Sequence, residues 1–150
     1  MIGTGYVGLV SGVCFSDLGN IVHCVDNNKE KINLLSQGKI PIHEPGLDEI
    51  LKRNVKQKRL FFTSDLKLAV NKADIIFICV GTPTKKKNNS ADLKYVFQVA
   101  KKLRKHIKKY KIVVTKSTVP VSTGDKIEKI LNSKGRKKIV DVVSNPEFLR

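Results

Sequence analysis

A glycine-rich segment near the start of the chain has residue types and spacing suited to binding a dinucleotide. Gly3, Gly5 and Gly8 form the pattern G-x-G-x-x-G, and Asp26 follows eighteen residues after Gly8. In such a segment the first glycine permits a tight turn from strand to helix. The second lets the backbone approach a pyrophosphate, and the third lets the helix pack closely on the sheet. We therefore expect phosphates to bind the N–H groups at the start of the helix that Tyr6 opens.

Asp26 indicates which dinucleotide would bind. It follows the apolar run IVHCV, which favours a strand, and it is placed to accept hydrogen bonds from an adenosine ribose. Its carboxylate would repel the 2′-phosphate of NADP, so we predict NAD as the cofactor. Only Met1 and Ile2 precede Gly3, whereas such a turn normally follows a full strand. We expect the natural chain to begin a few residues earlier.

Three further segments place hydroxyl or carboxylate groups directly after predicted strands, where open α/β sheets bind ligands. The first is Gly81-Thr82-Pro83-Thr84, which suits a loop close to a cofactor and equally suits an ordinary turn. The second contains Ser117 and Thr118, and the third contains Glu147. A lone carboxylate at such an edge is a candidate general acid/base or substrate ligand.

Apolar patterns along the chain alternate between strand and helix, which is typical of a parallel α/β sheet. The predicted strands cover residues 21–25, 60–63, 74–80, 111–116 and 139–143. The predicted helices cover residues 7–18, 29–37, 46–53, 65–71, 93–107 and 123–132, and residues 85–89 are predicted to form a loop. In the first helix, one apolar face contains Val7, Val10, Cys14 and Leu18. In the helix over 93–107, the apolar residues that fall on one face are Leu93, Val96, Phe97, Ala100, Leu103 and Ile107. We predict one Rossmann-like domain over residues 1–150, a doubly wound parallel sheet with helices on both faces.

The composition is that of an ordinary globular domain with a strong excess of positive charge. The 29 Lys and Arg residues outnumber 13 acidic residues, chiefly in 85–87, 101–111 and 134–138. A basic stripe is one feature of nucleic-acid binding; a solvated lysine-rich surface is the alternative that we favour, because aromatic residues rarely interleave these runs. No apolar run approaches the roughly 20 residues of a membrane helix, so we expect no membrane partner. Cys14, Cys24 and Cys79 lack metal-ligand spacing; as buried free thiols they favour the cytoplasm.

Several segments together resemble the UDP-glucose/GDP-mannose dehydrogenase family. They are GTGYVGLVSG at the start of the chain, GKIPIHEPGLDEIL (38–51), CVGTPT (79–84), KSTVPVSTGDKI (116–127) and SNPEFLR (144–150). They occur in the family's order over nearly the whole chain. The residues of these segments are most similar to the UDP-glucose 6-dehydrogenase branch. GDP-mannose and UDP-N-acetylmannosamine dehydrogenases are the alternatives within the family.

The resemblance implies roles for individual residues. The pyrophosphate would be held by Gly3, Thr4, Gly5, Tyr6, Val7 and Gly8. Asp26 and Lys31 would hold the adenosine ribose, although a lysine at position 31 is equally expected on a helix surface. The nicotinamide side would be lined by Val80, Gly81, Thr82, Pro83, Thr84, Ser117 and Thr118. Thr118 would also position a catalytic water, and Glu147 would be the general acid/base. The substrate loop would begin with Glu147, Phe148, Leu149 and Arg150.

The resemblance also implies an NAD-dependent, four-electron oxidation of UDP-glucose to UDP-glucuronate by a homodimer. Members of the family have a central dimerising helix, a second α/β domain and a catalytic cysteine beyond the part that resembles this chain. None of Cys14, Cys24 or Cys79 fits that cysteine. We therefore expect this chain to bind NAD without completing the reaction alone; a non-catalytic NAD-binding module is the alternative.

Overall fold

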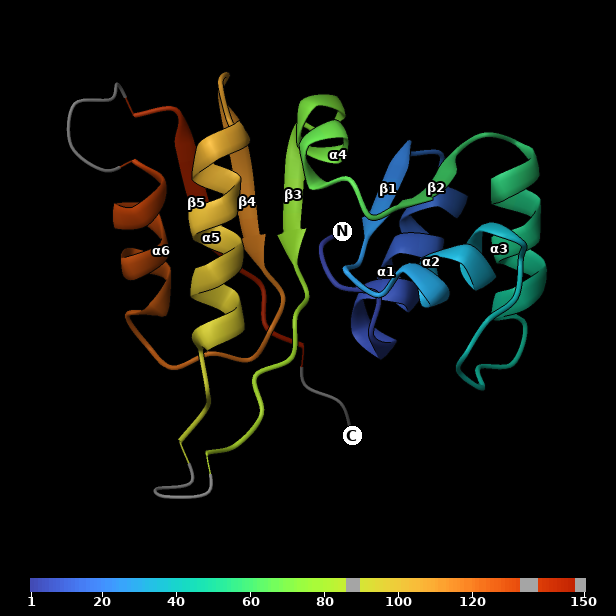
Figure 1. Ribbon diagram of the computed structural model, residues 1–150, viewed down its shortest axis with the longest axis horizontal. Helices are drawn as coiled ribbons and strands as arrows, with labels where there is room; N and C mark the ends of the chain where they lie inside the picture. Colours follow the sequence, from blue (N-terminus) through green and yellow to red (C-terminus); the bar gives the residue numbers. More distant parts are fainter. Residues whose placement is uncertain (86–89, 133–137, 148–150) are drawn as a thin grey trace. The chain divides into compact units, whose positions relative to one another are not determined.

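The computed structural model describes residues 1–85, 90–132 and 138–147. The chain divides into two compact units, Met1–Ala69 and Val70–Arg150, in which helices alternate with strands (Figure 1). All strand pairs within each unit's described residues are parallel. The predicted parallel α/β class is therefore confirmed.

The first unit places its helices around a two-stranded sheet. Its elements are α1 (Tyr6–Asp17), β1 (Val22–Val25), α2 (Lys29–Ser36), α3 (Leu47–Lys56) and β2 (Leu60–Thr63), followed by α4 (Leu66–Lys72), which crosses the boundary at Ala69. Val22 pairs with Leu60 and Val25 with Thr63. Helix α1 packs on β1 and α3, and the fully buried Leu9, Leu35 and Leu51 lie in the resulting core.

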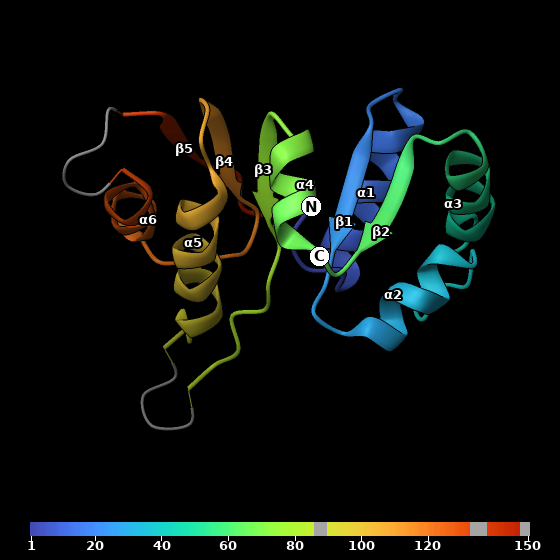
Figure 2. The same cartoon turned by 45° about the horizontal axis from the view of Figure 1, so that its top comes forward.

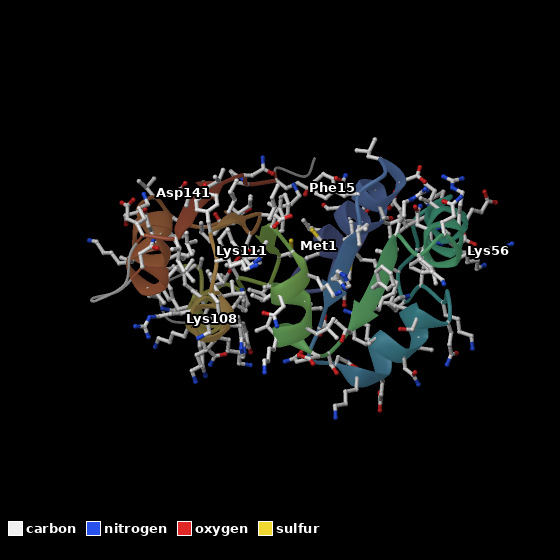
Figure 3. All side chains as sticks on the ribbon, turned by 90° about the horizontal axis from the view of Figure 1, so that it is seen from above. Met1, Phe15, Lys56, Lys108, Lys111 and Asp141 are labelled. Atoms are coloured by element: carbon white, nitrogen blue, oxygen red, sulfur yellow. The ribbon has the colours of Figure 1, made fainter. Side chains whose placement is uncertain are left out.

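Residues before Gly3 add a single pairing to β1 rather than a strand. Ile2 forms an isolated parallel bridge with Val25, the Val25 N–H donates to the Met1 carbonyl at 2.8 Å, and the Gly3 N–H donates to the Val25 carbonyl at 2.8 Å. The Met1 side chain packs against the core of this unit (Figure 3). These contacts hold the glycine-rich loop beside the carboxyl end of β1.

The second unit contains a three-stranded parallel sheet. Its elements are β3 (Ile75–Ile78), α5 (Lys94–His106), β4 (Lys111–Thr115), α6 (Thr123–Leu131) and β5 (Val140–Ser144), with strand order β3-β4-β5. Helices α5 and α6 pack side by side on one face of this sheet (Figure 2). Ile78 pairs with Thr115 and Thr115 with Ser144, so the three carboxyl ends lie along one edge.

Most predicted elements occur within a few residues of their predicted bounds. The strand predicted over 60–63 is Leu60–Thr63, and the helix predicted over 93–107 buries Val96, Ala100, Leu103 and Ile107 as expected. Within the described residues, no helix is both long and apolar enough to cross a membrane. Most of the loop predicted over 85–89, much of the basic run 134–138, and Phe148, Leu149 and Arg150 lie outside the described residues.

The predicted core face of α1 is wrong. The buried residues of this helix are Gly8, Leu9, Gly12, Val13 and Ser16, whereas Cys14 is exposed and Leu18 is 79% exposed. The apolar residues of α1 itself are distributed over every side of the helix, so their periodicity could not identify the buried face. The buried face carries the small residues: a Cβ at Gly12 would lie 2.6 Å from the Cys24 Sγ atom. Close packing on β1 therefore decides the orientation.

The three cysteines are expected to differ sharply in reactivity. All are free, but only Cys14 is exposed, and burial raises the pKa of the Cys24 thiol to about 11. Since thiolates are the reactive species, a disulfide reagent should label one thiol per folded chain, and two more after unfolding. Counting the released chromophore before and after denaturant checks this. Fast labelling that persists in Cys14→Ser would contradict the assignment.

Candidate dinucleotide site

The loop of residues 3–5, between Ile2 and the start of α1, leaves space for a ligand. Gly3 has φ 97°, a left-handed conformation that favours glycine. Gly5 has φ −66° and ψ −174°, which any residue can adopt, and a Cβ at Gly5 would meet nothing within 4 Å. Neither backbone conformation nor packing requires glycine at position 5. The open space is therefore suited to the close approach of a phosphate to the backbone.

The start of α1 is suited to an anion. Gly5 is the N-cap, no side chain caps the helix, and its first turn contains no acidic residue. N–H groups in the first turn of a helix lack acceptors inside the helix and carry partial positive charge. Tyr6, Val7 and Gly8, predicted to bind pyrophosphate, form this turn. The residues present thus fit the pyrophosphate of a dinucleotide.

Asp26 lies directly after β1, at the same end of the strand as this loop. Its Oδ2 atom accepts hydrogen bonds from the Thr4 N–H at 2.9 Å and the Thr4 hydroxyl at 2.7 Å. Its Oδ1 atom accepts a hydrogen bond from the Asn28 N–H at 3.0 Å. The Lys31 Nζ atom is 4.0 Å from Oδ2. The structure therefore brings together Thr4, Asp26 and Lys31, which were predicted to bind the cofactor.

The surroundings of Asp26 keep its carboxyl group ionised. Burial alone raises its pKa, but hydrogen bonds from Thr4 and Asn28 and the Lys31 ammonium outweigh that effect and hold the pKa below its ordinary value. The Asn28 side chain also accepts from the Lys31 N–H at 3.0 Å, capping α2. The start of α2 thus fixes both groups beside the loop.

Glu44 is a neighbour of this site that sequence reasoning missed. It precedes α3, and its Oε2 atom accepts a hydrogen bond from the Tyr6 hydroxyl. Glu44 is one of the residues in 37–40 and 42–46 that, with Asp48 and Lys52, line a hollow of about 560 Å³. Local sequence patterns could not indicate the contact of Glu44 with Tyr6, because the two partners are 38 residues apart in the chain.

In the second unit, hydrogen bonds link the three segments that follow the strands. The Ser117 hydroxyl donates to the Val80 carbonyl at 2.7 Å, and the Thr82 hydroxyl donates to the Thr118 carbonyl at 3.2 Å. The Thr118 hydroxyl donates to the Glu147 carbonyl at 3.5 Å. The loop after Val80 also includes open space at Gly81, a Pro83 carbonyl that accepts from the Asp92 N–H, and a bridge from Thr84 to Ala91.

Lys116 is a second partner that sequence reasoning missed. Its Nζ atom lies 2.9 Å from the Glu147 Oε2 atom, and these side chains are 14% and 32% exposed. The same Nζ atom donates to Asn145 Oδ1 at 3.4 Å. A half-buried ammonium beside Glu147 can hold this carboxylate in one orientation. The remaining predicted substrate residues, Phe148, Leu149 and Arg150, lie outside the described part of the chain.

Comparison with known families supports a dehydrogenase origin. Residues 1–150 match the model of the "UDP-glucose/GDP-mannose dehydrogenase family, NAD binding domain". The chain is 53% identical over 150 residues to the UDP-glucose 6-dehydrogenase of Rhizobium meliloti, covering 100% of this chain and 34% of that protein. A UDP-glucose 6-dehydrogenase of Bacillus subtilis is 53% identical over 152 residues, which cover 100% of this chain and 32% of that protein. The chain thus spans about a third of the length of these curated relatives.

Solved structures show the same similarity. A GDP-mannose dehydrogenase from Pseudomonas aeruginosa, crystallised as a ternary complex, has a TM-score of 0.93 and 40% identity, over 99% of this chain and 36% of that one. A UDP-glucose dehydrogenase from Pyrobaculum islandicum has a TM-score of 0.92 and 38% identity, over 99% of this chain and 35% of that one. The fold of this chain is therefore that of the matching part, about a third, of these nucleotide-sugar dehydrogenases.

Proposed function

Because this chain belongs to the UDP-glucose/GDP-mannose dehydrogenase family, we propose that its first unit holds NAD. The observation that carries this proposal is the loop at the start of α1, where Gly5 faces open space and Asp26 stands beside the loop at the end of β1. The family model describes an NAD-binding domain, which confirms the predicted cofactor for the family. Gly5 and α1 would hold the pyrophosphate, and Asp26 with Lys31 would hold the ribose.

For the whole protein we propose oxidation of UDP-glucose to UDP-glucuronate. When bound, NAD supplies the acceptor for the hydride that leaves the sugar alcohol. The proposal for UDP-glucose rests on the curated relatives at 53% identity, both UDP-glucose 6-dehydrogenases. The 40% identical GDP-mannose dehydrogenase makes a GDP-sugar the alternative substrate. We also propose a homodimer and a cytoplasmic location, the latter supported by the free cysteines.

The second unit would contribute proton-transfer and positioning groups. Glu147 is a carboxylate after β5 that can accept or donate a proton, and Lys116 at 2.9 Å fixes its orientation. Thr118, whose hydroxyl contacts the Glu147 backbone, would position the attacking water. Val80–Thr84 and Ser117 would serve the nicotinamide end of the cofactor, and Phe148, Leu149 and Arg150 would contact the nucleotide sugar.

Two substitutions separate cofactor binding from proton transfer. Asp26→Ala removes the acceptor proposed for the ribose, and the Kd for NAD should rise at least about tenfold, since hydrogen bonds to charged groups contribute roughly 1.5–3 kcal/mol. Glu147→Gln should leave this Kd within about twofold, because Glu147 is assigned to the reaction. Calorimetric titration with NAD measures both constants, and thermal unfolding verifies that each variant folds. Equal losses from both substitutions would contradict this division of roles.

A further inference from the structure

The carboxylate of Asp26 has little acceptor capacity left for a cofactor. An ionised carboxylate offers about four acceptor positions on its two oxygens. Thr4 fills two of them, both on Oδ2, through its N–H and its hydroxyl. The Asn28 N–H takes one position on Oδ1. One position remains, on Oδ1, so the orientation of the carboxylate decides whether that position is available to a ribose hydroxyl.

Thr4 is placed to control that orientation rather than to touch a cofactor. Thr4 lies inside the glycine-rich loop and is fully buried, with 0% of the residue exposed. A threonine hydroxyl has a single proton, and that proton is used in the 2.7 Å bond to Asp26 Oδ2. The Thr4 N–H is directed to the same oxygen. Both donors of this residue therefore act on Asp26.

We propose that Thr4 is the positioning residue for NAD selectivity: its two hydrogen bonds lock Asp26 so that Oδ1 meets the ribose 2′-hydroxyl and repels a 2′-phosphate. This inference rests on the proposed function of the first unit. It differs from the predicted role of Thr4 as a direct cofactor contact, because the buried residue acts through Asp26.

The Thr4 hydroxyl makes the shortest of the three hydrogen bonds to the Asp26 carboxylate, at 2.7 Å. Without it, the carboxylate would keep one backbone hydrogen bond on each oxygen, from the Thr4 N–H to Oδ2 at 2.9 Å and from the Asn28 N–H to Oδ1 at 3.0 Å, and its terminal torsion is a broad one. The bond from the hydroxyl closes a ring between Thr4 and Asp26 Oδ2. Lys31 lies at 4.0 Å from the same oxygen, a distance at which it adds charge without fixing direction. Removing the hydroxyl should therefore loosen the orientation of the carboxylate, and with it the direction of the free position on Oδ1.

The test compares Thr4→Val, which keeps the shape without the hydroxyl, with Thr4→Ser, which keeps the hydroxyl. The Kd values for NAD and for NADP are measured by calorimetry on the full chain. The ratio of the NADP constant to the NAD constant should fall about tenfold or more in Thr4→Val and stay within twofold of wild type in Thr4→Ser. Thr115→Val serves as the matched control, because it removes another buried hydroxyl, which donates to the Val143 carbonyl. Its ratio should equal that of wild type.

A second readout follows Asp26 directly by NMR titration of its carboxyl carbon. The hydroxyl of Thr4 is the largest of the influences that lower the pKa of Asp26, so Thr4→Val should raise this pKa and Thr4→Ser should not. Wild-type chain that binds NAD selectively, with an unchanged ratio in a folded Thr4→Val, would overturn the inference alone. Wild-type chain that binds neither dinucleotide would overturn the proposed function and, with it, the role of Thr4 in selectivity.

Discussion

Replacing Gly5 by valine is expected to raise the Kd for NAD about 100-fold while the chain stays folded. The φ and ψ of Gly5 suit a β-branched residue, and its Cβ would enter open space. The new side chain would occupy the volume that a pyrophosphate needs to reach the backbone N–H groups of α1. Losing one or two charge-assisted hydrogen bonds, at roughly 1.5–3 kcal/mol each, gives a change of this size.

Gly124→Val is the matched control for this experiment. Gly124 lies in the first turn of α6, close to a helix start as the N-cap Gly5 is, and a Cβ there would likewise meet nothing within 4 Å. It has no assigned role in binding, so its Kd for NAD should equal that of wild type. Calorimetry measures binding and thermal melts measure stability. If Gly5→Val bound NAD as well as Gly124→Val does, the phosphate would have to lie elsewhere.

Local patterns in the sequence were sufficient to predict the elements and the position of the acid. The strand before Asp26 and the strand Leu60–Thr63 are short, largely apolar runs, and polar residues mark their ends at Asp26 and Ser64. Helix α5 alternates buried and exposed residues with a clear helical period, so its core face, including Val96 and Leu103, was predicted correctly. Such features depend only on residues that are neighbours along the chain.

Features that depend on packing between distant segments could not be predicted in this way. Helix α1 has apolar residues on all of its faces, so the sequence did not show that Cys14 is exposed. The partner of Tyr6 is 38 residues away, and Lys116 meets Glu147 only because β4 and β5 are paired. The spacing of Gly8 and Gly12, four residues apart on one helical face, was the signal available for the buried side of α1.

The loop that we propose to bind phosphate depends on the close packing of α1 against β1, and this dependence leads to a second large effect. Gly12 lies in the middle of α1, and a Cβ there would be 2.6 Å from the Cys24 Sγ atom and 3.2 Å from the Met1 Cγ atom. Cys24 is fully buried, so its side chain has little space to retreat. Gly12→Val should lower the free energy of unfolding by about 3 kcal/mol, the upper part of the range for overpacked cores. Against a typical total of about 5–15 kcal/mol, that is a large share.

Urea unfolding followed by circular dichroism measures this loss, and a second substitution tests its cause. Cys24→Ala removes the sulfur atom nearest to the new side chain, so the double variant Gly12→Val/Cys24→Ala should be more stable than the sum of the two single changes predicts. Gly124→Val, with its open surroundings, should stay within about 0.5 kcal/mol of wild type. Strict additivity in the double variant would mean that the sulfur contact does not set the distance between α1 and β1. In that case Met1 and Val22, the other neighbours of Gly12, would have to set it.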